Sequence, residues 1–318
     1  MKDPQSHTPI SKPEALEALT RSGYLLESRV EAVLRRKQFR VEANTLIPEE
    51  DGQRRELDVW AGWARGYDFG PGGESSLGLE LVIECINPPQ PVAFITKQRQ
   101  DAFYERSDRW ESLKLVGNPS ELDTTPQHTW SWLASDLDLS RYYHYRTKRI
   151  STQYCSFQRK QGSAQWMALH RDEDHHAFRK LCVATNHFVN ETIVPEYMAD
   201  AAWSLSLIYP VLLIQGDIFE VRPSSRSATI VQSPHIQFCL SHVVAGEENT
   251  YQIDVISESY FPKYLDMLLR EMRLMHKRLE AKYEHLRAFR RTRDRNHQAY
   301  VESTRPRLGA TKSGPRAV

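Results

Sequence analysis

Three acidic residues lie in apolar surroundings along the first quarter of the chain. Glu27 follows the pair Leu25-Leu26, Asp58 stands between Leu57 and Val59, and Glu84 lies inside the apolar run 81–86. An unpaired carboxylate in such a run would cost several kcal/mol, so Glu84 requires a cation as its partner. A hard divalent cation such as Mg²⁺ takes oxygen ligands and usually keeps several waters. The three acids are therefore candidates for a Mg²⁺ or Mn²⁺ site, the alternative being separate surface and ion-pair roles.

The elements that must position these acids are one helical region and three strands. Apolar residues recur at spacings of three, four and seven over residues 13–37, which predicts one helix or two helices broken near Ser22-Gly23. Alternation predicts strands over residues 39–46 and 56–64. The apolar run 77–86 predicts a third strand that is buried on both faces.

The remaining elements place these strands in a mixed α/β fold. A helix is expected from Asp172 or Asp174 to about residue 196, followed by a buried strand over 208–215 and strands over 218–221, 236–244 and 251–256. A long helix is expected over about 262–300. We divide the chain into a flexible arm (1–12), the first part of the core (13–91), an insertion (92–171), the second part of the core with added strands (172–260), the long helix (261–302) and a disordered tail (303–318).

The three acidic segments resemble the PD-(D/E)XK superfamily, the restriction-endonuclease-like fold. Glu27 matches the acid on its first helix, Asp58 the aspartate at the end of its second strand, and Glu84 the first residue of the (D/E)XK element. The resemblance implies a mixed sheet flanked by helices, with Mg²⁺ held by these acids and by the backbone carbonyl of Cys85. It also implies Mg²⁺-dependent hydrolysis of a nucleic-acid phosphodiester, in which the metal supplies the nucleophilic hydroxide and stabilises phosphoryl charge.

The chain departs from this pattern at Ile86, where the superfamily has a lysine. Isoleucine carries no charge and cannot donate a hydrogen bond, so another cation must orient the attacking water or the site is silent. The candidate substitutes are Lys97, Lys160 and Lys180. Lys180 is expected on the helix that begins near Asp172, beside His176, which could also face the site.

Two clusters of basic residues are candidates for contacts to nucleic acid. Residues 141–149 interleave Arg141, Arg146 and Lys148 with aromatic rings such as that of Tyr143, a mixture that can stack on bases and contact phosphates, although an exposed edge strand is the alternative. The second half of the long C-terminal helix could lie along a phosphate backbone through Arg287, Arg290 and Arg291, or be solvated helix surface.

The bulk properties exclude several classes of protein. The 318 residues carry a net charge of +1, so any nucleic-acid surface must arise from local clustering. The four cysteines form no CxxC pair, which predicts reduced thiols in a cytoplasmic protein, and neither a signal peptide nor a membrane span is expected. The segment Gly70-Pro-Gly-Gly lacks the lysine of a phosphate loop, so no nucleotide cofactor is expected.

Two functions remain open from the sequence. The first is a metal-dependent nuclease, with DNA favoured over RNA. The alternative is a catalytically silent pseudo-nuclease that binds nucleic acid or protein, for example as a subunit of an antiviral defence assembly. In that case the stripe of apolar residues from Leu265 to Leu286 on the C-terminal helix would serve as a docking surface for a partner or a second copy.

Overall fold

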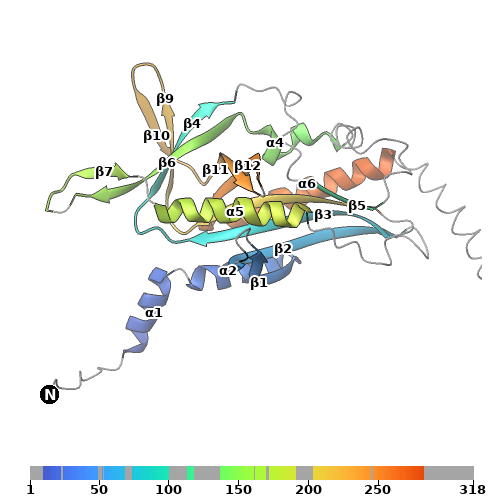
Figure 1. The fold of residues 1–318 in the computed structure, drawn as a ribbon, viewed down its shortest axis with the longest axis horizontal. Helices are drawn as coiled ribbons and strands as arrows, with labels where there is room; N and C mark the ends of the chain where they lie inside the picture. Colours follow the sequence, from blue (N-terminus) through green and yellow to red (C-terminus); the bar gives the residue numbers. More distant parts are fainter. Residues whose placement is uncertain are drawn as a thin grey trace, which may run out of the picture.

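The computed structural model describes residues 10–22, 24–48, 52, 54–68, 74–99, 113–117, 137–160, 162–169, 172–190, 203–244 and 246–282, and these form one mixed sheet with helices on both faces (Figure 1). The helices are α1 (Lys12–Ser22), α2 (Tyr24–Arg36), α4 (Tyr143–Arg146), α5 (Asp172–Asn190) and α6 (Phe261–Lys282). The strands are β1 (Arg40–Pro48), β2 (Arg54–Asp68), β3 (Glu74–Ile86), β4 (Val92–Gln98), β5 (Leu113–Gly117), β6 (Arg149–Arg159), β7 (Trp166–Leu169), β8 (Trp203–Ile214), β9 (Ile218–Pro223), β10 (Ala228–Gln232), β11 (His235–Val244) and β12 (Glu247–Ser257). The expected mixed α/β class is confirmed.

The sheet has the order β1-β2-β3-β8-β12-β11-β6-β4-β9-β10, with β5 paired to β8 and β7 paired to β6. Strands β1, β2 and β3 form an antiparallel meander, whereas β8 lies parallel to β3 along its length, from the pair Ser76 and Ser204 to the pair Ile86 and Ile214. Helix α5 precedes β8 in the chain and packs mainly on β8 and β3. The meander, α5 and β8 therefore form the part of the sheet that carries the acidic residues.

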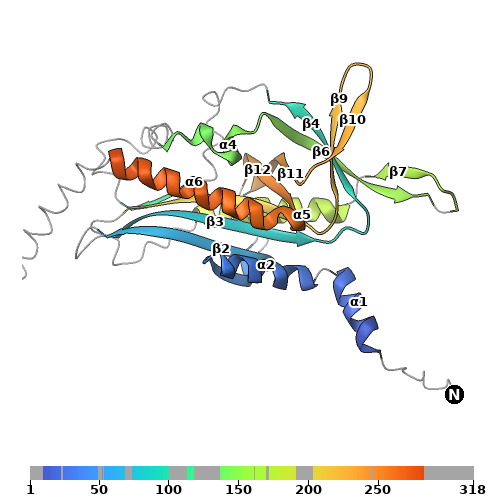
Figure 2. The same cartoon turned by 180° about the vertical axis from the view of Figure 1, so that it is seen from behind.

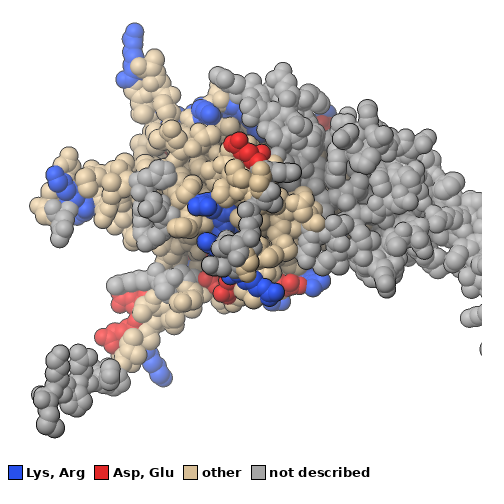
Figure 3. Space-filling model, viewed as in Figure 1, with Lys and Arg blue, Asp and Glu red and all other residues tan. Residues whose placement is uncertain are grey.

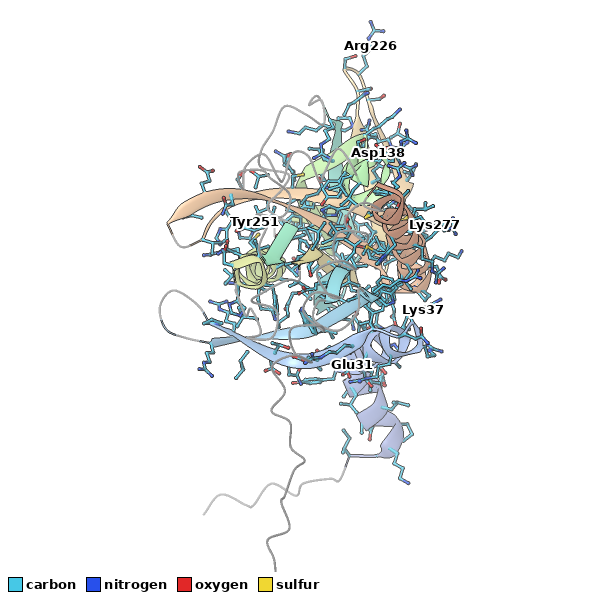
Figure 4. All side chains as sticks on the ribbon, turned by 90° about the vertical axis from the view of Figure 1, so that its right-hand side faces the viewer. Glu31, Lys37, Asp138, Arg226, Tyr251 and Lys277 are labelled. Carbon is cyan, nitrogen blue, oxygen red and sulfur yellow. The ribbon has the colours of Figure 1, made fainter. Side chains whose placement is uncertain are left out.

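The helices cover opposite faces of the sheet. On one face, α5 packs its buried side chains, such as Phe178 and Leu181, against the strands. On the other face, α2 and α6 bury a second cluster that includes Leu34 and Leu268. Figures 2 and 4 show α5 and α6 on opposite sides of the strands. Burial of apolar side chains, at roughly 25 cal/mol for each Å² removed from water, is the main stabilisation of this three-layer arrangement.

Several expectations about individual elements can now be compared with the structure. The break near Ser22-Gly23 is confirmed, because α1 ends at Ser22 and α2 begins at Tyr24. Residues 92–171, expected as an insertion, supply β4, β5, β6 and β7 to the same sheet. In the part of α6 that the structure describes, the apolar stripe is buried core rather than a docking surface, with Leu265, Met272 and Met275 at most 1% exposed.

An irregularity in the β1–β2 pair lies directly beside Asp58. Asn44 has a φ of +55°, and its register partner would be Asp58, between the pairs Ala43–Val59 and Thr45–Leu57. Leu57 joins the cluster under α5 while Val59 joins the cluster under α2 and α6, although residues two apart in a regular strand share a face. Asparagine tolerates the left-handed conformation that this kink requires. Asp58 is therefore placed where the strand changes the face that it buries.

Candidate metal and catalytic site

The carboxylates of Asp58 and Glu84 lie together at one end of the β2–β3 ladder. The last regular pair on this side is Val59 with Ile83. Beyond this pair, backbone N–H groups donate to carboxylate oxygens instead of to backbone carbonyls. The Cys85 N–H donates to Asp58 Oδ2 at 2.7 Å, and the Asp58 N–H donates to Glu84 Oε1 at 3.4 Å. The two acids are thus fixed by the backbone of each other's strand, which holds both carboxylates in defined positions.

The ammonium group of Lys180 bridges these two carboxylates. Its Nζ lies 2.5 Å from Glu84 Oε2 and 3.3 Å from Asp58 Oδ1. Lys180 comes from α5, and Glu84 points to the α5 face because its neighbours Val82 and Ile86, two residues to either side, pack against the cluster under that helix. The cation that Glu84 requires is therefore supplied by the helix and not by position 86 of the same strand.

Lys180 is the one lysine of the three candidates for which the structure records a contact to these acids. Lys97 lies exposed on β4, opposite Ile150 of β6, and four other strands separate β4 from β3 in the sheet order. Lys160 lies at the turn after β6, where its N–H bonds to the carbonyl of Gln165. The predictions for Lys97 and Lys160 are wrong, because neither side chain is placed beside the carboxylates.

Glu27 lies on α2, and the charges of the site residues Asp58 and Lys180 act on its carboxyl group. Burial raises the pKa of Glu27, and the charges of Asp58 and Glu56 raise it further. Burial likewise raises the pKa of the Cys85 thiol, with Asp58 and Glu84 as additional causes, so the thiol stays protonated when no metal is bound. The part expected of Cys85, through its backbone carbonyl, does not depend on the thiol.

A hollow of about 410 Å³ opens beside the two acids. Its lining consists of Arg55, Glu56, Glu84, His176, Ala177 and Lys180. His176 and Lys180 are four residues apart on α5, so their side chains lie on the same face of that helix. The hollow therefore has Glu56, Glu84 and Arg55 on the strand side and His176 and Lys180 on the helix side. This mixture of acids and cations suits an anion bridged to the carboxylates by a metal ion.

The electrostatics of the site favour the gain of positive charge. Burial and the neighbouring charge of Asp58 raise the pKa of Glu84 to about 8, and Lys180 offsets only part of that rise. The two carboxylates in turn raise the pKa of Lys180 against the opposing effect of burial, so the ammonium stays charged. The ammonium of Lys180 contacts two carboxylates, Asp58 and Glu84, so these three groups together carry a net negative charge when both acids are ionised.

The acids present fit a hard divalent cation. Mg²⁺ is commonly held by one or two carboxylates, with waters and substrate phosphate completing its shell. Asp58 and Glu84 supply such a pair, and the raised pKa of Glu84 reflects a negative charge that a cation would stabilise. Across the described residues, no group of three or more His, Cys, Asp or Glu side chains is arranged as a complete ligand set. The remaining positions would therefore be left to water, the Cys85 carbonyl and substrate.

The raised pKa of Glu84 predicts how stability depends on pH. The folded protein holds a proton that the unfolded chain releases near pH 4.5, so this group should lower the free energy of unfolding progressively as the pH rises from 4.5 to about 8. Glu84→Gln has no such proton, so without metal it should become more stable than the wild type towards pH 8, by on the order of a few kcal/mol. Urea denaturation of both proteins across this pH range measures the difference.

A matched control for this experiment is Glu80→Gln, four residues earlier on the same strand. Glu80 accepts a hydrogen bond from Trp60 Nε1 at 3.2 Å, and glutamine retains an acceptor oxygen for it. This variant removes a carboxylate from the same strand and leaves the contacts of Lys180 with Glu84 and Asp58 in place, so it controls for the loss of one charge. A pH-independent difference between Glu84→Gln and the wild type would instead mean that Lys180 keeps Glu84 ionised throughout.

The residues expected to contact nucleic acid differ in their exposure to solvent. Tyr143 is 6% exposed and packs edge-on against Tyr264 and His235, so the prediction that its ring stacks on a base is wrong. The expected alternative of an edge strand is also wrong for this segment, because a 3₁₀ turn (Leu139–Arg141) and α4 precede β6.

The cations of this segment remain at the surface. Arg146 and Lys148 are exposed, and Arg141 is exposed while its guanidinium pairs with Asp138. Their contact with nucleic acid remains a prediction. Arg287, Arg290 and Arg291 lie outside the residues that the structure describes.

Comparison of the chain with family models, with curated proteins and with solved structures gave no match. The argument about function therefore depends on the site itself. None of the helices that the structure describes has the length and apolar character needed to cross a membrane.

Sequence reasoning missed two charged residues of the hollow, Arg55 and Glu56. Both lie on β2 just before Asp58, in the stretch Arg54-Arg-Glu-Leu-Asp. The available signal was the strand period of two, which places Glu56 on the same face as Asp58 if the strand is regular. The kink at Asn44 and Asp58 removes that regularity, so the period alone could not assign their faces.

Proposed function

We propose that this protein is a metal-dependent nuclease of the restriction-endonuclease-like superfamily, with its catalytic ammonium supplied by α5. The observation that carries the proposal is the bridge from Lys180 Nζ to Glu84 Oε2 and Asp58 Oδ1. A lysine at this position would take the part of the motif lysine, because it contacts Glu84 on the face of β3 toward which Glu84 points. The order of elements, α2, the β1–β2–β3 meander, α5 and the parallel strand β8, supports the same assignment.

The chemistry assigned to these residues follows from their positions. Asp58 and Glu84, with the Cys85 carbonyl, would hold Mg²⁺ or Mn²⁺, which lowers the pKa of bound water and stabilises charge on the phosphoryl oxygens when bound. Lys180 orients the attacking water by donating a hydrogen bond to it and stabilises the hydroxide electrostatically. Glu27, on whose carboxyl the charge of Asp58 acts, would support the metal through water. Arg55 provides positive charge and His176 an imidazole N–H donor for the phosphate of the substrate.

One observation favours the silent alternative. All four carboxylate oxygens of Asp58 and Glu84 already accept from donors of the chain, namely Lys180 and the two backbone N–H groups. Such a set can stabilise the fold without metal, as an ion pair at the end of a strand ladder. The two readings differ in whether a metal ion displaces the ammonium from direct contact with the acids.

The test of the proposed function is cleavage of nucleic acid by the purified full-length chain. Single- and double-stranded DNA and RNA are incubated with Mg²⁺, with Mn²⁺ and with EDTA, and the products are separated on denaturing gels. Metal-dependent strand cleavage that EDTA abolishes is the expected result. Absence of cleavage with every substrate and both metals, together with no metal binding by calorimetry, would assign the chain to the silent alternative.

A further inference from the structure

The β6–β7 hairpin leaves the body of the protein as a free-standing ribbon. Its paired residues run from Ser156–Leu169 to Arg159–Trp166, and every residue of β7 is exposed. Figures 1 and 2 show this ribbon projecting past the helices that cover the sheet. Trp166 is 46% exposed and Met167 37% exposed. Large apolar side chains held out on a projecting element mark a surface that contacts something else.

The ribbon lies within a stretch of chain that lacks negative charge. From Leu139 to Arg171 there are seven Lys and Arg residues and no Asp or Glu. At the ribbon, Arg159 and Lys160 are exposed, and no ion pair to either is recorded among the described residues. By contrast, Arg149 and Arg222 pair with the buried Glu220 at the base of the neighbouring strands. Figure 3 shows basic side chains at the end of this projection.

Arginine and tryptophan are arranged as one unit near the turn. Arg159 and Trp166 are direct cross-strand partners, and Arg159 Cζ lies 5.0 Å from the centre of the Trp166 ring. The contact holds the guanidinium group over the ring. Binding a phosphate then requires less additional loss of side-chain entropy. An ordered guanidinium and an indole edge at the end of a ribbon provide both phosphate and base contacts.

The base of the ribbon is joined to the chain segments that adjoin the candidate site. The Phe157 N–H donates to the carbonyl of Pro91 at 3.3 Å, and Pro91 belongs to the loop that leaves β3 five residues after Ile86. On the other leg, Leu169 ends β7 three residues before α5 begins, and the first turns of α5 bring His176 and Lys180 to the hollow. Both legs of the ribbon are therefore connected to elements that carry residues of the hollow.

From these observations we infer that the ribbon Gln158–Met167 is a DNA-binding arm that enters the major groove of a B-form duplex. Two paired strands lie about 4.8 Å apart, so with their side chains they match a groove about 12 Å wide. The major groove of an RNA duplex is too narrow and deep for such an element. Arg159 and Lys160 contact phosphates and Trp166 contacts base edges. The inference rests on the proposed function in taking nucleic acid as the substrate, and it adds the duplex class and the surface that holds it.

Charge decides between DNA and a protein partner for this ribbon. A protein that paired with the exposed edge of β7 would gain backbone hydrogen bonds without needing cations at the tip. The ribbon instead places two unneutralised cations beside its aromatic residue. The second projecting hairpin, β9–β10, carries Arg226 at its end, well away from the core in Figure 4. Both hairpins carry exposed cations and lie in the same half of the sheet, so a long polyanion such as a duplex could contact both of them.

The test measures binding without metal, so that cleavage plays no part in it. A fluorescent DNA duplex of about 25 base pairs, long enough for two turns of major groove, is titrated with the full-length wild type and with Arg159→Ala/Lys160→Ala at several salt concentrations. Loss of two phosphate contacts should weaken binding about tenfold or more and reduce the slope of log K against log salt by about 1.8. Trp166→Ala should weaken binding to the duplex with the salt slope unchanged.

The matched control is Arg273→Ala, which removes an exposed arginine from α6 on the opposite face of the sheet. This variant should bind as the wild type does, and melting curves check that all variants remain folded. The inference is overturned if the double variant binds the duplex like the wild type, if single-stranded DNA or duplex RNA binds the wild type as tightly as duplex DNA, or if no nucleic acid binds. Binding through the ribbon without cleavage by the wild type would overturn the proposed function alone.

Discussion

Replacing Lys180 by methionine is expected to lower the rate of metal-dependent cleavage by about 10³-fold, within the range for loss of one positioned charge or proton donor. Methionine keeps the length of the side chain but cannot orient water or stabilise hydroxide. Since the ammonium competes with a metal ion for Asp58 and Glu84, the variant should bind Mg²⁺ at least as tightly as the wild type. Single-turnover cleavage at saturating Mg²⁺, together with calorimetric titration of the metal, separates the two effects.

Lys97→Met is the matched control, because it removes the same charge from an exposed position of β4. It should cleave as the wild type does. Ile86→Lys offers a second test, since residue 86 lies on the same face of β3 as Glu84. Introduced into Lys180→Met, it returns an ammonium from the strand and should restore about tenfold or more of the lost rate. Equal cleavage by Lys180→Met and the wild type would mean that Lys180 is structural.

Glu84→Gln and Asp58→Asn are each expected to reduce cleavage by about 10³-fold or more, since a bound metal supplies both the nucleophile and charge stabilisation. Both substitutions keep the size of the side chain and an acceptor oxygen, so the hydrogen bonds from the Asp58 and Cys85 N–H groups can persist. Weaker metal binding distinguishes these variants from Lys180→Met. Excess Mn²⁺ should recover part of the activity if the remaining acid still holds the ion.

Glu80→Gln controls for a change of charge on the same strand. It should leave both metal binding and cleavage near wild-type levels, since Glu80 bonds to Trp60 and is not in contact with the Lys180 ammonium. Full cleavage by both Glu84→Gln and Asp58→Asn would exclude this pair as the catalyst. Loss of cleavage with metal binding unchanged in both variants would argue that the metal sits elsewhere.

The strands were predictable because their signals are local. The apolar run in residues 77–86 predicts a buried strand, and β3 extends over Glu74–Ile86 with β2 on one side and β8 on the other. The break at Ser22-Gly23 is similarly local, since glycine weakens a helix. The strands β4 to β7 were not assigned from the sequence. The strands β4, β5 and β6 pair with strands far away along the chain. Strand β7 pairs with the adjacent β6, but all of its residues are exposed, so it has no buried face for a pattern to reveal.

The candidate site was partly predictable for a related reason. A carboxylate within an apolar strand implies a cation, so Glu84 and its neighbour Asp58 could be selected without a structure. The sequence alone could not show which side chain supplies that cation. Lys97, Lys160 and Lys180 are equivalent in sequence terms, and Lys180 is 96 residues beyond Glu84. Only the packing of α5 on β3 and β8 brings its ammonium within 2.5 Å of Glu84.

By itself, the sequence determined which residues carry chemistry and the local conformation that presents them: the acids Asp58 and Glu84, their strands, and a helix beginning near Asp172. The tertiary structure decided which of the distant side chains meet, because such contacts depend on strand order and helix packing that local patterns do not encode. Tyr143 illustrates the difference. Its basic, aromatic neighbourhood indicated an exposed surface, whereas the packing of α6 and β11 buries its ring.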